Sequence, residues 1–301
     1  MEKNVKFKKN KTSININTWK FITLPVLLIV IFSFFPMIQA FLLSFQSGKG
    51  TAMHFIGIDN YIKLLHDTLF LESVKNTLIY LGIQVPIMLL LALIIASMLN
   101  SDKIKFKGFF RTAIFLPCIT SLVAYSVLFK SLFSVDGFIN KVLMSINIID
   151  KPIPWLLDPF WAKVVIIIAI TWRWTGYNMM FYLAAMQNID GSVYEAATVD
   201  GASKIQQFFK ITVPLLKPII LFTAIISTNG TLQLFDEVVN ITSGGPGNAT
   251  MSISQYIYNL SFVNTPNFGY AATVSYAIVF MVAILSFIQM KVAGDKNEQS
   301  K

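Results

Sequence analysis

The chain has 301 residues, of which 55% are hydrophobic and only 13% are charged. Soluble domains carry about 25% charged residues, so this composition excludes a soluble globular protein and indicates an integral membrane protein. The formal net charge is +9. Because lysine and arginine also set the orientation of membrane spans, this excess does not require a nucleic-acid partner, and we expect none.

Six stretches are long and apolar enough to cross a bilayer, which takes about 20 residues of helix. In lipid the backbone polar groups must be bonded within the spanning segment, so helices are the expected form. The sequence therefore predicts an all-α polytopic membrane protein whose six transmembrane helices cover residues 21–45, 74–99, 109–132, 161–186, 219–239 and 271–292. We divide the chain into a basic N-terminal tail over 1–20, a transmembrane domain over 21–293 and a C-terminal tail over 294–301.

Two of these stretches carry internal interruptions. Pro117 lies inside the third stretch and predicts a kink there, because proline removes one backbone hydrogen bond. Polar residues interrupt the fifth stretch, yet we expect it to continue as one helix. Cys118 is the only cysteine, so the chain cannot form an internal disulfide or a cysteine metal site.

The distribution of lysine and arginine sets the expected orientation. Cations gather in the N-terminal tail, the second and fourth connections and the C-terminal tail, which all lie on one side of a six-span topology. The positive-inside rule therefore places both tails and the fourth connection in the cytoplasm. The N-terminal apolar run is too long for a signal peptide and lacks a small-x-small cleavage site, so we expect it to be retained as the first span.

The fourth connection contains the most informative pattern in the chain. Ser192 and Glu195 have the spacing of a capping box, in which each side chain bonds an unpaired amide at a helix start. Ser203 and Gln206 repeat this spacing. The pattern therefore predicts two short helices, laid end to end on the membrane surface.

Gly201 lies between the two expected helices and suits the left-handed backbone of a helix C-terminus. Ala197 lies four residues earlier, so the two residues would share a nearly bare helix face on which a partner docks closely. Pro214 is expected to limit the second helix. Spacing alone slightly favours the alternative, an amphipathic connector on the membrane surface without a partner.

The same segment resembles the EAA signature of ABC-importer permeases. That signature reads Glu-Ala-Ala, three residues, Gly, nine residues, Ile, one residue and a Leu-Pro pair. The matching positions are Glu195, Ala196, Ala197, Gly201, Ile211 and Pro214, with Val213 in place of the usual leucine. The resemblance implies that residues 188–217 form a coupling segment that docks on a cytoplasmic ATPase, with Glu195 as its anchor.

Further motifs resemble one subfamily, the binding-protein-dependent sugar permeases related to the maltose-system MalF subunit. Residues 55–61 resemble its F-x-G-x-x-N-Y segment, residues 111–117 its R-x-x-x-x-L-P segment, and residues 137–140 its G-x-x-N pattern. Residues 241–250 resemble its L-T-x-G-G-P-x-x-x-T loop, with isoleucine in the leucine position. The resemblance implies that this loop faces a binding protein through Gly244, Gly245 and Pro246.

This resemblance covers residues 20–293 and implies the type I ABC importer permease fold. It implies a non-catalytic subunit that forms half of a translocation pathway for sugars, with di- or oligosaccharides as the expected substrates. The implied partners are a second six-span permease subunit, two copies of a cytoplasmic ABC ATPase, an extracytoplasmic solute-binding protein or lipoprotein, and membrane lipid. The implied location is the bacterial inner membrane.

The chain itself contains no Walker A pattern, so we expect no nucleotide site in it. ATP and magnesium would be used by the partner ATPase. For this chain we expect no cofactor, no metal and no catalytic residue of its own.

Two groups of polar and aromatic residues are candidates for the substrate path, because polar groups inside spans tend to face the bundle interior. Aromatic rings can stack on sugar C–H faces while amides pair with hydroxyls. The candidates are Arg173, Trp174, Tyr177 and Asn178 in the fourth span, and Asn229, Gln233 and Asp236 on one face of the fifth. The alternatives are interface anchoring for the aromatic residues and interhelical hydrogen bonding for the amides.

Arg173 raises a question about the substrate. A lone arginine at membrane depth needs a partner, which Asp236 or Glu237 would supply if the helices are neighbours. An anionic substrate such as glycerol 3-phosphate would use the same guanidinium. We favour a neutral sugar, with Arg173 at the mouth of the cavity.

Two other classes of protein remain as alternatives at this point. One is a secondary transporter that needs no ATPase, although the sequence shows no internal repeat to support it. The other is a polytopic membrane enzyme. The only histidines, His54 and His66, lack the spacing of an H-x-x-x-H metal site and suggest no Ser-His-Asp order.

Overall fold

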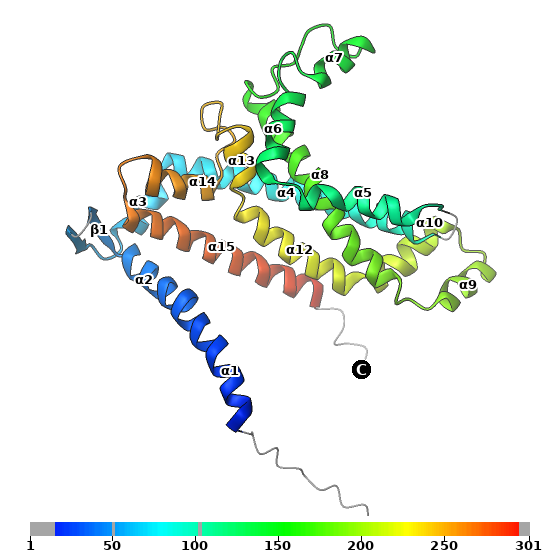
Figure 1. The fold of residues 1–301 in the computed structure, drawn as a ribbon, viewed down its shortest axis with the longest axis horizontal. Helices are drawn as coiled ribbons and strands as arrows, with labels where there is room; N and C mark the ends of the chain where they lie inside the picture. Colours follow the sequence, from blue (N-terminus) through cyan, green and yellow to red (C-terminus); the bar gives the residue numbers. More distant parts are fainter. Residues whose placement is uncertain (1–15, 50–51, 102–103, 295–301) are drawn as a thin grey trace, which may run out of the picture.

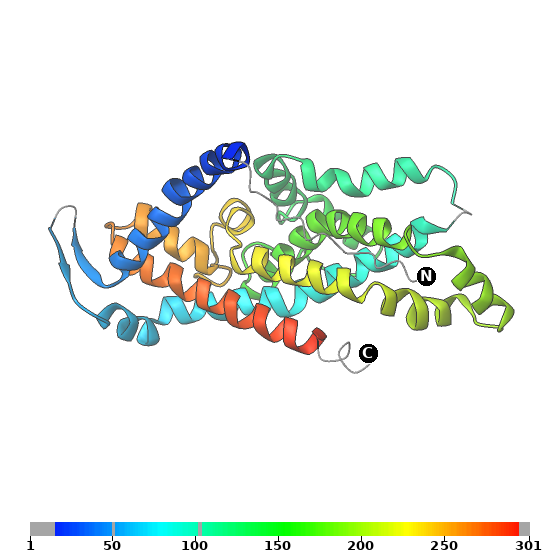
Figure 2. The same cartoon turned by 90° about the horizontal axis from the view of Figure 1, so that it is seen from below.

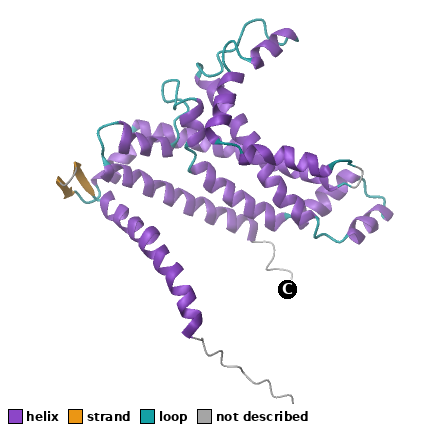
Figure 3. Cartoon of the chain, in the orientation of Figure 1, coloured by secondary structure: helices purple, strands orange, loops and turns teal. Residues whose placement is uncertain are grey.

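The computed structural model describes residues 16–49, 52–101 and 104–294 and is almost entirely helical (Figures 1 and 3). Within these residues, the one sheet is an antiparallel hairpin of strands β1 (Gln46–Lys49) and β2 (Ala52–Phe55). The all-α prediction is therefore confirmed for the architecture, apart from this short hairpin. Most of the predicted N-terminal tail and nearly all of the predicted C-terminal tail lie outside the described residues.

The helices and π-helical turns (η) follow one another along the chain. They are α1 (Ile16–Ile29), η1 (Val30–Phe34), α2 (Phe35–Ser44), α3 (Asp59–His66), α4 (Thr68–Asn100), α5 (Lys107–Ile119), α6 (Leu122–Leu132), α7 (Phe138–Ser145), α8 (Pro159–Met186), α9 (Gly191–Val199), α10 (Lys204–Gln207), η2 (Phe208–Thr212), α11 (Val213–Leu215), α12 (Lys217–Leu232), α13 (Asp236–Ile241), α14 (Ile253–Tyr258), η3 (Asn259–Val263) and α15 (Phe268–Gly294).

Four helical stretches are each long and apolar enough to cross a membrane. They are Phe21–Ser44, Thr68–Asn100, Pro159–Met186 and Phe268–Val292. Two bent helix pairs add a span each when both halves are taken together: α5 with α6, bent by 98°, and the α10–α11 stretch with α12, bent by 69°. The six predicted spans correspond to these four helices and two bent pairs.

The third predicted span is not one kinked helix, as we expected, but two helices. α5 ends two residues after Pro117, and α6 begins at Leu122 after an extended link at Thr120 and Ser121. Arg173 of α8 donates hydrogen bonds to backbone carbonyls at this break. In a continuous helix, backbone amides of the next turn would bond these carbonyls. At the break, the guanidinium of Arg173 bonds them instead.

The fifth predicted span is also wrong at its C-terminal end. α12 ends at Leu232, residues 233–235 are not helical, and α13 begins at Asp236. The buried hydroxyl of Ser252 donates to the carbonyl oxygen of Leu234 at 2.5 Å. This bond, together with burial of the Leu234 side chain, stabilises the break.

α4 and α8 form the centre of the bundle (Figures 1 and 2). α8 packs against α4 and α5, while α12 packs against α4 and α15. Gly176 lets α8 approach α5 closely, because a Cβ at this position would lie 2.0 Å from the carbonyl oxygen of Ile114. The hairpin and α9 lie at opposite ends of the bundle in both views.

The first span, formed by α1, η1 and α2, diverges from the bundle (Figure 1). None of its most apolar window is buried within the described chain. It is attached at its C-terminal end, where α2 packs against α15. There the Tyr276 hydroxyl donates to the carbonyl oxygen of Met37 at 2.7 Å. An apolar surface of this length requires lipid or another protein to cover it.

α6 and α7 project from the bundle as an outer arm (Figure 1). Asn140 is fully buried and holds this arm together. Its Nδ2 donates to the carbonyl oxygens of Val135 and Ile153, both at 2.9 Å, and its Oδ1 accepts from Nε1 of Trp155 at 2.8 Å. The connection after α6 is therefore an ordered unit.

Candidate functional site

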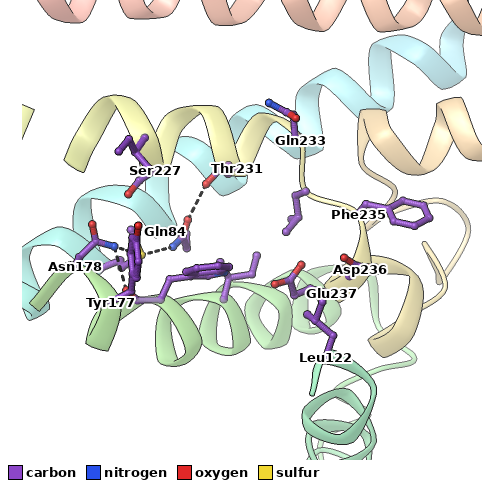
Figure 4. A pocket seen from close by; sticks show the side chains of 16 residues that line it. Gln84, Leu122, Tyr177, Asn178, Ser227, Thr231, Gln233, Phe235, Asp236 and Glu237 are labelled. Carbon is purple, nitrogen blue, oxygen red and sulfur yellow. Dashed lines mark hydrogen bonds between the residues drawn. The ribbon is translucent and has the colours of Figure 1, made fainter. Parts of the chain in front are cut away.

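A cavity of about 370 Å³ lies where α4, α6, α8 and α12 meet the segment 233–237 (Figure 4). Its volume falls in the range of small-molecule sites, about 300–1,000 Å³. The lining residues are Gln84, Met88, Leu122, Ile170, Trp174, Tyr177, Asn178, Ile226, Ser227, Gly230, Thr231, Gln233, Leu234, Phe235, Asp236 and Glu237. Eight of these sixteen residues are apolar or aromatic, seven carry amide, hydroxyl or carboxylate groups, and one is glycine.

Three of the four candidates from the fourth span lie in the α8 wall of this cavity. The rings of Trp174 and Tyr177 meet edge to face, with centroids 5.8 Å apart. The Tyr177 ring also packs edge to face on Phe181, at 5.1 Å. Asn178 is buried, and its Nδ2 donates to the carbonyl oxygen of Trp174 at 3.0 Å. The aromatic surfaces and the amide are thus held in fixed orientations.

The opposite wall contains two polar residues that the sequence analysis missed. Gln84 of α4 is buried, and its Oε1 accepts a hydrogen bond from the hydroxyl of Thr231 in α12 at 3.2 Å (Figure 4). Its Nε2 donates to the sulfur of Met88 at 3.1 Å. An amide in a long apolar stretch is costly unless it has a partner, so Gln84 was detectable as a candidate from its position in the second span.

The three candidates of the fifth span do not share a helix face, because α12 ends before the last two of them. Gln233 caps α12 and Asp236 begins α13, and both still line the cavity. Asn229 is exposed and lies outside the lining, where its Oδ1 accepts a hydrogen bond from the Gln233 amide. The prediction of a single polar face is therefore wrong, although the break brings Glu237 into the cavity wall.

Arg173 lies outside the cavity lining, contrary to its expected place at the mouth. Its side chain is 6% exposed, and Nη1 donates to the carbonyl oxygens of Thr120 at 3.1 Å and Pro117 at 3.4 Å. Nη2 donates to the carbonyl oxygen of Cys118 at 3.3 Å. Its guanidinium also lies over the Tyr125 ring, 5.0 Å from the centroid.

The expected ion pair between Arg173 and a carboxylate is absent from the described part of the chain, where the guanidinium binds backbone carbonyls instead. Arg173 and Glu237 are close enough to interact electrostatically. Because guanidinium groups present several donors in a fixed plane, arginine suits a cluster of carbonyls at a helix end. The residue therefore fastens the break between α5 and α6 to α8.

In segment 188–217, the start of α10 and the turn at Gly201 follow the local sequence signals, whereas the start of α9 does not. Asp190, not Ser192, caps α9, and its carboxylate accepts a hydrogen bond from the Ser192 amide at 3.0 Å. The predicted capping box at Ser192 and Glu195 is therefore wrong, because an aspartate two residues earlier takes the cap position. The capping box of Ser203 and Gln206 is confirmed in both directions.

The turn after α9 follows the helix-ending motif expected of glycine. Gly201 has φ +77°, and its amide donates to the carbonyl oxygen of Thr198 at 3.1 Å. The Ala202 amide donates to the carbonyl oxygen of Ala197 at 2.9 Å. These two bonds are the Schellman pattern, so the predicted role of Gly201 is confirmed. Pro214, in contrast, does not end the second helix, which continues to Leu215.

The surface of the coupling segment is mixed in character. Glu195, Ala196, Gly201 and Pro214 are exposed, whereas Ala197 and Ile211 are partly buried. Val199 is 89% exposed, which is unusual for an apolar side chain. A shallow depression in this region is lined by Tyr194, Glu195, Thr198, Val199 and Lys204. The segment thus presents an acidic side chain beside apolar surface at one end of the bundle.

The Gly244–Pro246 loop is fastened to α4. Gly244 has φ +82°, and the peptide bond between Gly245 and Pro246 is cis. The Thr250 hydroxyl donates to the carbonyl oxygen of Gly245 at 2.8 Å, and the Tyr80 hydroxyl donates to the carbonyl oxygen of Thr250 at 3.0 Å. Gly244 is buried, and Gly245 and Pro246 are partly buried. The loop is therefore held in place on the same helix that supplies Gln84 to the cavity.

This geometry defines a polytopic membrane protein with an internal polar cavity and an exposed segment at one end of the bundle. A family model described as "Binding-protein-dependent transport system inner membrane component" matches residues 69–293. The chain belongs to this family. It is a permease subunit of an ABC importer and not an enzyme, and the family works with a solute-binding protein.

Its relatives are permeases of sugar transport systems. The chain is 55% identical to the lactose transport system permease protein LacF of Rhizobium radiobacter, over 94% of this chain and 95% of that protein. It is 32% identical to the arabinooligosaccharides transport system permease protein AraP of Halalkalibacterium halodurans, over 89% and 85% of the two chains. It is 31% identical to the multiple sugar-binding transport system permease protein MsmF of Streptococcus mutans, over 91% and 94%.

The fold is that of a solved importer. A chain of a bacterial ABC transporter involved in import of the acidic polysaccharide alginate superposes with a TM-score of 0.81 at 24% identity, covering 94% of this chain and 96% of that one. A chain of a bacterial alginate ABC transporter in complex with an alginate pentasaccharide-bound periplasmic protein superposes with a TM-score of 0.76. This likeness shows the fold of an ABC importer permease.

Proposed function

We propose that this chain forms half of the translocation pathway of an ATP-driven importer for a neutral di- or oligosaccharide in a bacterial inner membrane. The observation that carries the proposal is the cavity between α4, α8 and α12, in which aromatic rings, amides, hydroxyls and carboxylates lie among apolar side chains. The lactose permease relative at 55% identity supports a disaccharide in particular.

Tyr177 and Trp174 offer ring faces and edges to the C–H surface of a sugar. Asn178, Gln233 and Asp236 offer groups that hydrogen-bond hydroxyls. Such a site gains orientation from its few polar groups, while the apolar surface excludes water. Because the residues come from several helices, a change in helix arrangement alters the affinity of the site for the sugar, which is what alternating access requires.

The charges around the cavity favour a neutral substrate over an anion such as glycerol 3-phosphate. Two carboxylates, of Asp236 and Glu237, line the walls, and no lysine or arginine does so among the described residues. The nearby guanidinium of Arg173 is already bonded to backbone carbonyls. An anion entering the cavity would therefore meet like charge and no cationic side chain in the lining of the described residues.

The proposal also assigns partner proteins to two segments of the chain. The coupling segment 188–217 binds a cytoplasmic ATPase, with Glu195 as the anchoring carboxylate, and both chain termini lie on that side. The Gly244–Pro246 loop faces the solute-binding protein. A second six-span permease completes the pathway, and two copies of the ATPase use ATP and magnesium; this chain binds no cofactor.

Uptake by the complete transporter, reconstituted in vesicles with its binding protein, tests this proposal. Replacing Tyr177 or Asn178 with alanine is expected to lower uptake of a neutral disaccharide by at least tenfold. Replacing the exposed Thr112 of α5, which lies outside the cavity lining, is the control and is expected to change uptake less than twofold. Normal uptake by both cavity variants would overturn the proposed path.

The energy source is tested in the same vesicles. Glu195→Ala is expected to abolish uptake while the chain still inserts, and vanadate is expected to stop uptake by the unmodified transporter. Competition with glycerol 3-phosphate is expected to leave disaccharide uptake unchanged. Normal uptake by Glu195→Ala would contradict the coupling role of this segment.

A further inference from the structure

Gln207 differs from its neighbours in the coupling segment because its side chain is buried. Only 4% of it is exposed, whereas Ile205 is 72% and Phe209 is 62% exposed. A buried side-chain amide needs hydrogen-bond partners to offset the loss of water. Its partners therefore reveal what this residue holds together.

The Gln207 side chain bridges the turn at Gly201. Its Nε2 donates to the hydroxyl oxygen of Thr198 at 2.9 Å and to the carbonyl oxygen of Ala202 at 3.2 Å. Its Oε1 accepts a hydrogen bond from Nζ of Lys204 at 3.1 Å. Thr198 belongs to α9, while Gln207 is the last residue of α10, so this amide joins the two helices on either side of the glycine.

A second side-chain bond reinforces the first. The hydroxyls of Tyr194 and Thr212 lie 2.9 Å apart and share a hydrogen bond between α9 and η2. Thr212 is buried, and its hydroxyl lies 3.4 Å from the carbonyl oxygen of Gln207, to which it can donate. α9 is therefore fastened at two points to the helix that follows the turn.

This fastening matters because the turn itself is a glycine link with few contacts. A Cβ at Gly201 would meet nothing within 4 Å, so no other element packs against this point of the turn. Beyond η2, the fully buried Leu216 marks the 69° bend into α12. The far end of α12 supplies Gly230 and Thr231 to the cavity.

We infer that Gln207 is a positioning residue that, with Thr198, makes α9 and the α10–α12 stretch move as one body. When the ATPase displaces Glu195, the α10–α12 stretch then moves with α9 and shifts the cavity wall. Without this bond, α9 would rotate about Gly201 and the stretch after it would not follow. This inference rests on the coupling role proposed for the segment. It states that the bond of Gln207 keeps the number of ATP molecules used per imported sugar low.

The test is the number of ATP molecules hydrolysed per sugar imported by the complete reconstituted transporter. Thr198→Val removes the hydroxyl that accepts from Gln207 while keeping the side-chain shape. Gln207→Leu removes the amide. Each variant is expected to raise the ratio at least threefold. The double variant is expected to raise it no further than the larger single effect, because both changes break the same contact between Thr198 and Gln207.

Two controls separate this role from simple loss of folded protein. Thr198→Ser keeps the hydroxyl and is expected to keep the normal ratio. Thr112→Val makes the same substitution in α5, where the exposed hydroxyl donates to the carbonyl oxygen of Gly108 at 3.0 Å, and it is also expected to keep the ratio. Loss of assembled transporter lowers uptake and ATP hydrolysis together and leaves the ratio unchanged.

An unchanged ratio in Thr198→Val and Gln207→Leu would overturn the inference, whether or not total uptake falls. If Gln207→Leu does not assemble, Thr198→Val decides the matter by the same measurement. Failure of the proposed function gives a different result, since Glu195→Ala would then retain normal uptake. Loss of uptake in Glu195→Ala, together with an unchanged ratio in Thr198→Val and Gln207→Leu, would refute this inference and leave the proposed function standing.

Discussion

Replacing Gly176 with alanine tests the contact that places the α8 wall of the cavity against α5. Gly176 is buried in α8, next to Tyr177. A Cβ at this position would lie 2.0 Å from the carbonyl oxygen of Ile114 and 2.7 Å from its carbonyl carbon. Both are backbone atoms, so rotation of a side chain cannot relieve the overlap.

The size of the effect follows from this distance. A carbon atom approaches a carbonyl oxygen to about 3.3 Å, so the two helices must separate locally by roughly 1 Å. Overpacking of this kind costs about 1–3 kcal/mol, which the helix preference of alanine over glycine, about 1 kcal/mol, offsets in part. The same separation lengthens the bonds from Arg173 to the end of α5. We therefore expect a net loss of about 1–2 kcal/mol in stability.

Thermal unfolding of the detergent-solubilised transporter measures this loss, and Gly82→Ala is the matched control. Gly82 also lies inside a long helix, α4, but a Cβ there would meet nothing within 4 Å. Gly82→Ala is expected to unfold at the same temperature as the unmodified protein or slightly higher. If Gly176→Ala unfolds no earlier than Gly82→Ala and transports normally, the close α5–α8 contact is refuted.

Three further substitutions test other parts of the structure. Arg173→Lys should lower the unfolding temperature by a loss of about 1–3 kcal/mol, because one ammonium cannot replace the guanidinium at three carbonyls; unchanged unfolding would argue against this role. Asn140→Leu should expose the outer arm to limited proteolysis, since its buried partners lose their bonds; equal cleavage of both proteins would contradict it. Burial opposes ionisation of Asp67, yet hydrogen bonds from Tyr256, Tyr270 and two backbone amides hold its pKa below 3.8. Its contribution to stability is thus present above pH 3.8 and lost as pH falls through the lower pKa of the folded state. Unfolding temperatures measured across this acid range should therefore fall less steeply for Asp67→Asn.

Local patterns in the sequence predicted local structure well. Ser203 and Gln206 form the expected capping box, and Gly201 adopts the left-handed backbone, because both features depend on residues within one turn of helix. The cap at Ser192 was mispredicted for a local reason too. Asp190 is as good a cap and lies two residues earlier, so the helix starts there.

The positions of polar residues in the cavity were less predictable. Tyr177 and Asn178 line it, as predicted. Gln84 was overlooked although it is an amide inside an apolar span, and its pairing with Thr231, distant in the sequence, could not be predicted. Arg173 was assigned to the mouth of the cavity or to an ion pair. Its real partners are carbonyls at the end of another helix, and such partners exist only once that helix breaks.

The sequence by itself determined the class of protein, the approximate positions of the long apolar helices, and the glycine turn and second capping box of segment 188–217. Hydrophobic length, charge distribution and capping residues act within a single segment, so they can be read along the chain. Only the tertiary structure decided where the third and fifth spans break and which residues surround the cavity. Each break is stabilised by a side chain from elsewhere, Arg173 in one case and Ser252 in the other. A donor brought to a free carbonyl by packing has no signature in the segment that it bonds.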